Sequence, residues 1–553
     1  MSRRHSRRRR RAAALAVLAA LCAGAIGACG GGGVAATPSA SASLTAHTFI
    51  DLVGELPTDL DETGTPDPAS VAILPSWSSE LVRPAPAAPG PNARLPPDDA
   101  VVPYLATSWQ RAGDGSYTFA LRRGVHGVSG DPFTAADVRW SLERAAARSP
   151  VAPFLFALGH IDAADPVTII DSHTVRVNVT SPSPFTLSVL ASYDLAIYDS
   201  ALYRSHATAS DRWAQQWGAT HSASFGAYWV ETFLPRREIV LAANPGFWRP
   251  PYYTRVVIRE VLSASARVAA VLAGSATHTS GLDWGDFDNA VDTGATDGAR
   301  AAILQTGPAV VAWHLDVASG PLANPLVRQA ISLSINRAEM AAGIYETYDQ
   351  PTALTVPAAF GQSQPSAFDP EQARSLLRSA GYPVPAGLVI DVYTNNEEAG
   401  GWLGPILTDL SEDLINQLGV NLRVVYVNDS DQLLALEQSP GVQSSIDVDT
   451  PLLGGAGVLL EQDANTVLDP VSRAAEQHYA SPALQSLLDQ LLNSPGGAAS
   501  AALISQAAAS IDATLPTINL VAIPVQNVTR ANVTGYSAYT QPVTYYEYLH
   551  PTS

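Results

Sequence analysis

Two side chains that act as covalent nucleophiles in many enzymes, lysine and cysteine, are absent or rare in this sequence of 553 residues. Lysine is absent, because all 32 basic residues are arginines, and the only thiols are Cys22 and Cys29. Without lysine the chain has no Walker A motif, no Schiff base and no Ser-x-x-Lys nucleophile pair. These absences exclude several large enzyme classes before any fold is considered.

Serine and histidine remain as possible catalytic residues. A hydrolase with a serine nucleophile would be the most plausible enzyme, but the sequence contains neither Gly-x-Ser-x-Gly nor the zinc motif His-Glu-x-x-His. The 11 histidines are scattered singly and not clustered as metal ligands would be. We therefore expect a protein that is not an enzyme and that needs no metal or other cofactor.

The one cysteine with an evident chemical role is Cys29. The first eleven residues contain seven arginines, and the next seventeen are uncharged up to Ala28. A basic segment, a short apolar segment and small residues at the cleavage site are typical of an export signal, here 1–28. Ile26-Gly27-Ala28-Cys29 fits the bacterial lipobox, in which the cysteine sulfur receives a lipid. We predict lipidation of Cys29 and anchoring to the outer face of the cell membrane.

Two alternatives concern this N-terminal segment. An uncleaved membrane anchor is disfavoured, because the glycine-rich residues 29–46 are typical of a flexible tether. Ser6-Arg7-Arg8 leaves twin-arginine export open beside the general route. Cleavage would leave Cys29 as the last cysteine, so the mature chain has no disulfide, and its stability depends on hydrophobic cores.

Charge argues against nucleic acid as a partner. After loss of the seven signal arginines, 25 arginines stand against 51 acidic residues, a net charge of about −26. Binding to phosphate backbones depends on basic groups, so a nucleic-acid partner is disfavoured. A well-solvated acidic surface, mildly attractive to cationic ligands, is the simpler expectation.

Local patterns predict alternating strands and helices, which is typical of an α/β fold. Thr134 and Asp137 form a capping-box pattern before the apolar positions of a helix. Gly381 and Gly419 are placed as helix stops. The segment 84–103, rich in proline and alanine, is predicted to be an irregular surface loop. Strands are predicted at 47–56, 117–121, 174–179, 229–233, 238–242, 256–261, 310–315, 388–394 and 421–427, and helices at 263–273, 324–334, 370–380, 405–418 and 496–509.

Several of these segments, in this order, resemble the large extracytoplasmic solute-binding proteins of ABC importers, the family of dipeptide-, oligopeptide- and nickel-binding proteins. The resemblance covers roughly 100–390. Its motifs are LATSW (105–109), DGSYTFALRRGV (114–125), GDPFTAADV (130–138), WSLERA (140–145), FGAY (225–228), NPGFW (244–248), VRQAI (327–331), INR (335–337) and ARSLLRSAGY (373–382). Most of them specify fold and not ligand, since they contain turns and strand breaks.

The resemblance implies a two-lobed periplasmic-binding-protein fold of type II, in the large peptide-binding class, with an extra subdomain in the first lobe. The first lobe would comprise 47–310 and 516–553, including a subdomain at about 75–200, and the second lobe 311–515. The chain would cross between lobes near 306–316 and return near 515–523. We expect a monomer that binds a small-molecule or peptide ligand and delivers it to ABC permease and ATPase subunits.

A ligand enclosed between lobes needs aromatic walls and a few polar groups. The resemblance and the predicted strand ends suggest six candidates: Trp313 in a crossing strand, Asp283 and Trp284 in a loop that reaches the cleft, Tyr393 and Asn395 at a strand end, and Asp447. For each aromatic residue, packing in a core is the competing role.

The sequence departs from the family at one segment that bears on the identity of the ligand. Peptide-binding relatives carry an acidic stretch of the type Trp-x-x-Asp-Tyr-x-Asp-Pro in the second lobe, whereas this sequence reads SIDVDTPLLGG at 445–455. The tryptophan and the tyrosine are missing, and either Asp447 or Asp449 could replace the acid. The alternative function is therefore a non-transport envelope lipoprotein of the same fold that regulates or scaffolds cell-wall assembly.

Overall fold

The structure is a computed structural model. It describes residues 47–61, 73–89, 100–149, 151–282, 284–294, 298–345, 367–395, 403–428, 432–433, 436, 439, 442–449, 481–494, 498–537, 539 and 543–552. All of these belong to one compact unit, Leu44–Ser553. Within them, no helix is both long enough and apolar enough to cross a bilayer.

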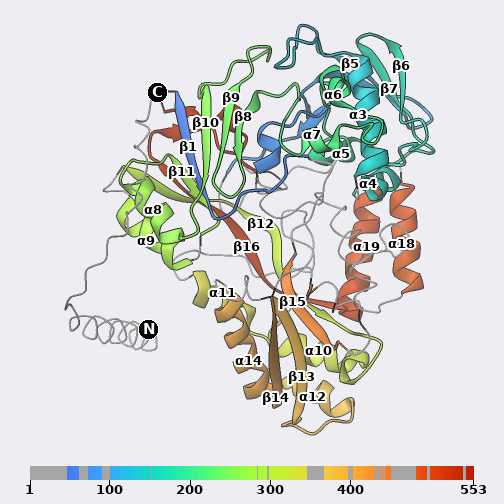
Figure 1. The fold of residues 1–553 in the computed structure, drawn as a ribbon. Helices are drawn as coiled ribbons and strands as arrows, with labels where there is room; N and C mark the ends of the chain where they lie inside the picture. Colours follow the sequence, from blue (N-terminus) through green and yellow to red (C-terminus); the bar gives the residue numbers. More distant parts are fainter. Residues whose placement is uncertain are drawn as a thin grey trace, which may run out of the picture. The chain divides into compact units, whose positions relative to one another are not determined.

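A ten-stranded mixed sheet dominates the described part of the chain (Figure 1). Its spatial order is β14-β13-β15-β12-β16-β11-β1-β10-β9-β8. The strands are β1 (Thr48–Val53), β8 (Tyr228–Leu234), β9 (Glu238–Ala243), β10 (Arg255–Glu260), β11 (His278–Ser280), β12 (Ala299–Leu315), β13 (Leu388–Asn395), β14 (Val420–Val427), β15 (Ser444–Asp449) and β16 (Thr517–Arg530).

Strands β12 and β16 connect the two halves of this sheet (Figure 1). They run antiparallel from Ala299 opposite Arg530 to His314 opposite Thr517, with register shifts along the way. β16 pairs with β11 near one end, and β12 pairs with β15 near the other. We call β1 and β8–β11 the sheet of the first lobe, β13–β15 the sheet of the second lobe, and residues 305–310 with 522–525 the crossing. The predicted residue boundaries of the lobes stay predictions.

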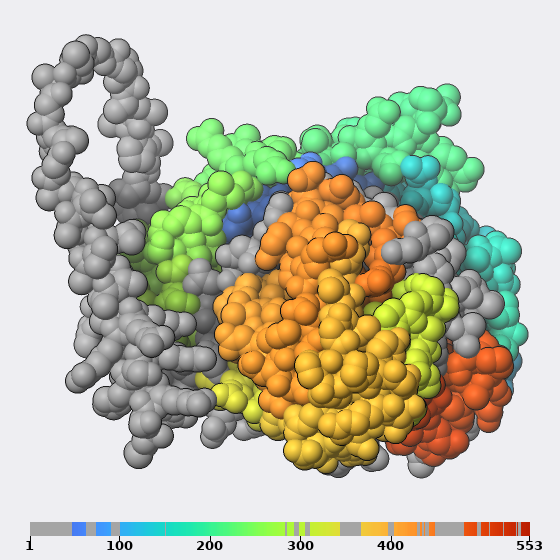
Figure 2. Space-filling model, turned by 90° about the horizontal axis from the view of Figure 1, so that it is seen from below, coloured from blue at the N-terminus to red at the C-terminus, as the bar shows by residue number. Residues whose placement is uncertain are grey.

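Each lobe has its own hydrophobic core. In the first lobe, helices α8 (Ala264–Leu272) and α9 (Trp284–Gly294) cover one face of the sheet, and Val268, Val271 and Phe287 are buried there. In the second lobe, the helices α10 (Pro325–Ser334), α11 (Arg337–Tyr345), α12 (Pro370–Ser379) and α14 (Gly404–Leu418) contribute to a separate core. Figure 2 shows this lobe as a continuous surface in yellow and orange.

Helix α14 illustrates how the sequence produces these cores. Leu407, Leu410, Leu414 and Leu418 recur every three or four residues and are all buried, so they form one apolar stripe. Full burial of such a side chain contributes about 1.5–3 kcal/mol. Gly419 ends the helix in the left-handed conformation with φ of 69°, as predicted.

A smaller four-stranded sheet forms the centre of the inserted part of the first lobe, in the order β4-β5-β7-β6. The predicted capping box is confirmed, because Thr134 and Asp137 bond reciprocally at the start of α3. The strands and longer helices of this inserted part are β4 (Ala106–Arg111), β5 (Tyr117–Leu121), β6 (Val167–Asp171), β7 (Thr174–Val177), α3 (Ala135–Arg148) and α4 (Ala152–Gly159). The short elements near it are α5 (Thr186–Val189), η2 (Tyr193–Leu195), α6 (Ser200–His206) and α7 (Gln215–Gly218).

The segment 84–103 differs in part from the prediction. Its two ends form an antiparallel pair, in which β2 (Val82–Pro84) lies against β3 (Val101–Pro103). Each strand has a proline as its last residue, and beyond Pro84 the backbone N–H of Ala85 still donates to the carbonyl oxygen of Ala100 at 2.9 Å. Residues 90–99 lie outside the described part. The predicted irregular loop is therefore wrong at both ends.

Two helices that precede β16 in the chain contact both lobes. Leu484, Leu488 and Leu491 of α18 (Pro482–Leu492) belong to the largest buried cluster, which also contains first-lobe residues. At the end of α19 (Ala498–Thr514), Arg328 of α10 donates to the carbonyl oxygen of Thr514 at 2.8 Å. Figure 2 shows this helix pair (red) beside the yellow-green segment that contains α10. The predicted alanine-rich helix is confirmed, with later bounds.

The C-terminal residues return to the first lobe. The Tyr546 hydroxyl donates to Asp51 Oδ2 at 2.6 Å, and the guanidinium of Arg83 is ion-paired with Glu547. Burial holds the pKa of the Tyr546 hydroxyl well above its ordinary value, and the carboxylate of Asp51 acts in the same direction. Short elements complete this region: η1 (Leu74–Ser76), β17 (Val533–Thr534), η6 (Tyr546–Tyr548), β18 (His550–Pro551) and, near the second lobe, η3 (Pro321–Ala323).

Candidate functional site

The parallel strands of the second lobe end near the crossing. β15 is antiparallel to β12, and its register runs from Ser444 opposite Leu315 to Asp449 opposite Val310. Since Val310 borders the crossing, β15 runs toward it. β13 is parallel to both β15 and β14, so all three strands have their carboxyl ends on the side of the crossing.

The first lobe shows the same relationship from the other side. β11 is antiparallel to β16, with His278 opposite Thr529 and Ser280 opposite Asn527. Asn527 is the closer of the two β16 residues to the crossing, so β11 also runs toward it. β1 is parallel to β11 and to β10. In open α/β sheets ligands bind beyond the carboxyl ends of the strands, so the crossing marks the candidate site.

Three of the predicted site residues share one face of the second-lobe sheet. Ile390 and Val392 of β13 belong to the core, so Tyr393 and Asn395 face the opposite side, since side chains alternate along a strand. Tyr393 lies opposite Ser445. The same register, continued by two residues, brings Asn395 to the level of Asp447.

Asp447 also has a partner that the sequence did not reveal. Its Oδ1 atom lies 2.9 Å from Nε2 of His314 on β12, and Nδ1 of the same ring lies 3.4 Å from the hydroxyl of Thr517 on β16. His314 is buried, whereas Asp447 is partly exposed. The carboxylate is thereby fixed at the strand ends and still open to solvent on one side.

Trp313 lies apart from this group. It neighbours His314 on β12, but its ring points to the other face and is fully buried with Ile331 and Leu410 in the second-lobe core. Its indole nitrogen has no hydrogen-bond partner within the described part of the chain. The structure therefore places Trp313 in the core and not with Tyr393, Asn395 and Asp447.

The other sequence predictions can be placed only in part. Trp284 is the first residue of α9, at the end of the loop that follows β11. Asp283 and Cys29 lie outside the described residues. In the described ranges, no three His, Cys, Asp or Glu side chains are grouped as a metal site would require.

The first lobe contributes a row of polar side chains that sequence reasoning missed. Asp51 Oδ1 lies 2.8 Å from Nδ1 of His278. Across β16, the hydroxyl of Thr529 lies 3.1 Å from that of Tyr536, which stacks on the ring of His278. Asn527 is two residues from Thr529 and so shares its face of the sheet.

Two arginines from the sequence motifs that resemble the family, Arg328 and Arg337, position β16 and the end of the helix before it. Arg337 donates to the carbonyl oxygens of Asn519 at 2.7 Å and Ser332 at 3.0 Å, and so attaches β16 to α10. Burial lowers the pKa of its guanidinium to about 10, which still leaves it charged at neutral pH. Arg328 similarly fixes the end of α19, 2.8 Å from the oxygen of Thr514. These arginines support the crossing and do not themselves form a ligand site.

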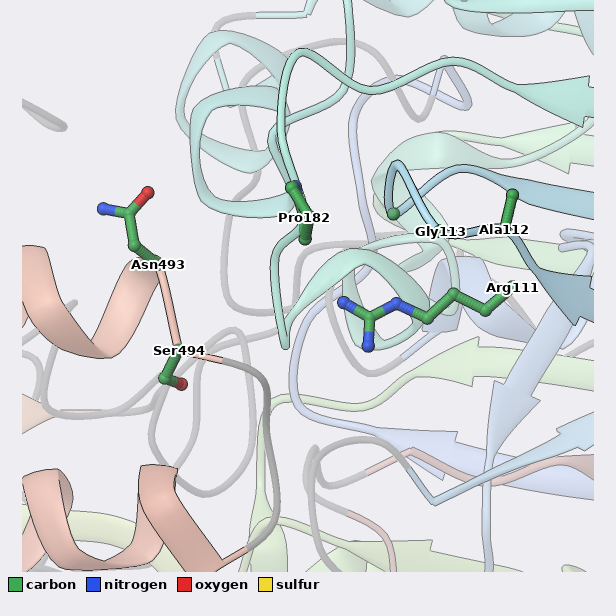
Figure 3. Close-up of a pocket in the computed structure, with 7 residues that line it drawn as sticks. Arg111, Ala112, Gly113, Pro182, Asn493 and Ser494 are labelled. Carbon is green, nitrogen blue, oxygen red and sulfur yellow. The ribbon is translucent and has the colours of Figure 1, made fainter.

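One pocket lies elsewhere in the molecule. Its volume is about 480 Å³, and it lies between the β4–β5 turn, Pro182 and the end of α18 (Figure 3). Asn493, Ser494 and the exposed side chain of Arg111 line it. The Ser494 hydroxyl is already hydrogen-bonded to that of Ser500 at 2.6 Å. The pocket includes no strand end of the large sheet, so we do not assign the candidate site to it.

Comparison with known families gives one extended match. Residues 100–447 match the family model for bacterial extracellular solute-binding proteins, family 5 Middle. The chain is 25% identical to the glutathione-binding protein GsiB of Escherichia coli (strain K12) over 359 residues, or 64% of this chain and 65% of that protein. The chain thus spans just under two thirds of that relative's length. The protein of the same name from Salmonella choleraesuis is 24% identical over 421 residues, 75% of this chain and 76% of that one.

Solved structures show the same fold at low identity. The dipeptide-binding protein of Pseudoalteromonas sp. SM9913, in complex with Met-Leu, is 16% identical with a TM-score of 0.75 over 91% of this chain and 100% of that one. DppA from Helicobacter pylori, in complex with the peptide STSA, is 20% identical with a TM-score of 0.69 over 91% and 98%. These similarities confirm the predicted two-lobed α/β fold.

Proposed function

Because the chain belongs to family 5 of the bacterial extracellular solute-binding proteins, we propose that it captures a peptide-like or other polar solute between its lobes and delivers it to an ABC transporter. Binding would be reversible and without turnover. The observation that carries the proposal is the convergence of parallel strand ends from both lobes on the crossing. A hinge made of two strands allows the lobes to close on a ligand.

The second-lobe residues Tyr393, Asn395 and Asp447 are proposed as ligand contacts. They share the sheet face opposite the helices, and the carboxylate of Asp447 is held by His314 at 2.9 Å. An aromatic ring, an amide and a carboxylate suit a ligand that has apolar, neutral polar and cationic groups. A peptide or peptide-like molecule combines all three.

Calorimetric titration of the mature domain tests this proposal. The titrants are a mixed pool of di- to pentapeptides, glutathione, a pool of oligosaccharides and a nickel chelate. We expect heat of binding from the peptide pool, and a higher melting temperature when that pool is present. Binding of none of these titrants would contradict the proposed function.

The segment 445–455 departs from the peptide-binding pattern, and this departure supports a second candidate function, that of a non-transport lipoprotein of the cell envelope. Affinity purification from membranes distinguishes the two. A transport role predicts recovery of ABC permease and ATPase subunits, whereas recovery of cell-wall assembly proteins without these subunits would favour the second function.

We also propose that the protein acts at the outer face of the cell membrane, held there by a lipid on Cys29 and the tether 29–46. The basis is the sequence of the first 46 residues. A receptor held in this way stays beside its transporter, and the acidic mature chain needs no nucleic acid or cofactor for this role.

A further inference from the structure

Asn527 is a buried amide without a hydrogen-bond partner. The residue is 1% exposed, and neither its Oδ1 nor its Nδ2 atom has a partner within the described part of the chain. Among the buried side chains of the described residues, it alone lacks partners at two polar atoms. Burial of an unpaired donor and acceptor destabilises a folded protein, so such an arrangement calls for a functional explanation.

The position of Asn527 indicates where a partner would come from. On β16 it is opposite Ser280, the last residue of β11, and on the other side opposite Ala302 of β12. Both neighbours are partly exposed, whereas Thr529, two residues further from the crossing, is fully buried and bonded to Tyr536. Asn527 thus lies where the buried polar row of the first lobe ends and the strand ends of the candidate site begin.

Other unpaired polar atoms lie in different surroundings. The hydroxyl of Thr394 is fully buried without a partner, but it shares the β13 face of Val392 and so points to the helix-covered core. The indole nitrogen of Trp313 is likewise enclosed in that core. Each of these is one weakly polar atom, whereas Asn527 offers a donor and an acceptor together.

We propose that Asn527 is a ligand-binding and specificity-determining residue of the first lobe. Its carboxamide would accept from an N–H group and donate to a C=O group of the same amino-acid unit in an extended, peptide-like ligand. The inference rests on the proposed function and narrows its ligand class to molecules that carry a neutral amide. A buried amide rejects ligands without such a pair, because its own polar atoms would then remain unpaired.

The variant Asn527→Leu tests this role, and Thr394→Val is its matched control. Both changes replace an unpaired buried polar side chain by an apolar one of similar size. We expect Asn527→Leu to weaken binding of the peptide pool about tenfold or more, without lowering the melting temperature of the ligand-free protein. Thr394→Val should bind the pool as the wild type does.

A second measurement uses ester analogues of the peptide that binds most tightly. Replacement of the amide N–H that contacts Asn527 by an ester oxygen should lower the affinity of the wild type for the peptide. The same replacement should leave the affinity of Asn527→Leu unchanged, as in a double-mutant cycle. Equal affinity of wild type and Asn527→Leu, or a lower melting temperature of the ligand-free variant, would overturn the inference and leave the proposed function standing. Failure of the wild type to bind any peptide would overturn both.

Discussion

The side chains of His314 and Asp447 are hydrogen-bonded across 133 residues of sequence, with Nε2 2.9 Å from Oδ1. The pair joins β12 to β15 at the strand ends of the second lobe. His314 is buried while Asp447 remains partly exposed, so the histidine fixes the carboxylate from behind. This arrangement gives the segment 445–455 an acid in a defined position, although the family's tryptophan and tyrosine are missing.

We expect Asp447→Ala to weaken ligand binding about tenfold, which corresponds to about 1.4 kcal/mol. It should also lower the free energy of unfolding by about 1–2 kcal/mol, because buried His314 loses this acceptor. Asp391→Ala on β13 is the control, since Asp391 is on the same face of the second-lobe sheet as Asp447 but is ion-paired with the exposed Arg423. The control should change stability by less than about 0.5 kcal/mol. Calorimetry and urea denaturation measure both effects, and unchanged affinity of Asp447→Ala would exclude Asp447 from the site.

A second prediction concerns a buried ion pair that joins Asp61 to Arg144 in the inserted part of the first lobe. Asp61 Oδ2 lies 2.6 Å from Nη2 of Arg144, and both side chains are at most 1% exposed. Burial alone would lower the pKa of Arg144, but the carboxylate raises it above its ordinary value. Asp61→Asn leaves the buried guanidinium without its counter-charge, so we expect the free energy of unfolding to fall by about 3–5 kcal/mol.

Chemical denaturation at constant pH measures this loss. The control is Glu143→Gln, which removes the exposed pair between Arg139 and Glu143 and should cost less than about 0.5 kcal/mol. Similar losses for the two variants would show that the buried pair adds no more than a surface pair.

Local features of the fold were predictable from the sequence because they depend on neighbouring residues. The capping box of Thr134 and Asp137 and the glycine stops at Gly381 and Gly419 are confirmed by the structure. Each of them satisfies backbone groups within one helical turn. The family resemblance supplied the two-lobed architecture, which local patterns alone do not specify.

The candidate site was harder to predict from the sequence, because it depends on strand register between distant segments. The run from Val310 to Leu315 is apolar on both sides of the strand up to Trp313, so alternation could not show which face the tryptophan occupies. His314 became significant only when β12 and β15 were paired. Asn527 could not be recognised at all from sequence, because its distinguishing property is the absence of a partner among the described residues.

A third prediction tests the proposed lipid anchor. Cys29→Ala should release the protein into the medium or leave it unprocessed, because alanine has no sulfur to receive the lipid. Cys22→Ala is the matched control, since Cys22 lies in the apolar part of the predicted signal and should be dispensable. Membrane fractionation and mass determination of the mature N-terminus are the measurements. Membrane retention of a correctly cleaved Cys29→Ala form would contradict the anchor.

A fourth prediction follows from Asp194, a carboxyl group that is 2% exposed. Burial raises the pKa of Asp194 from 3.8 to about 6, although the hydroxyl of Ser192 donates to it and partly opposes the rise. The folded protein therefore binds this proton more tightly than the unfolded chain. Stability from this group is fully present below about pH 4 and is lost as the pH rises through about 6.

Asp194→Asn removes the ionisation and can keep the hydrogen bond from Ser192. At pH 7.5 we expect the variant to be more stable than the wild type by up to about 3 kcal/mol, at about 1.4 kcal/mol per pKa unit. Near pH 4 the difference should vanish, because the wild-type group is then neutral in the fold. Asp171→Asn is the control: its pKa is lowered by the backbone N–H of His173, so any change should have the opposite sign. Equal urea midpoints for Asp194→Asn and wild type at both pH values would show that Asp194 is ionised in the fold at little cost.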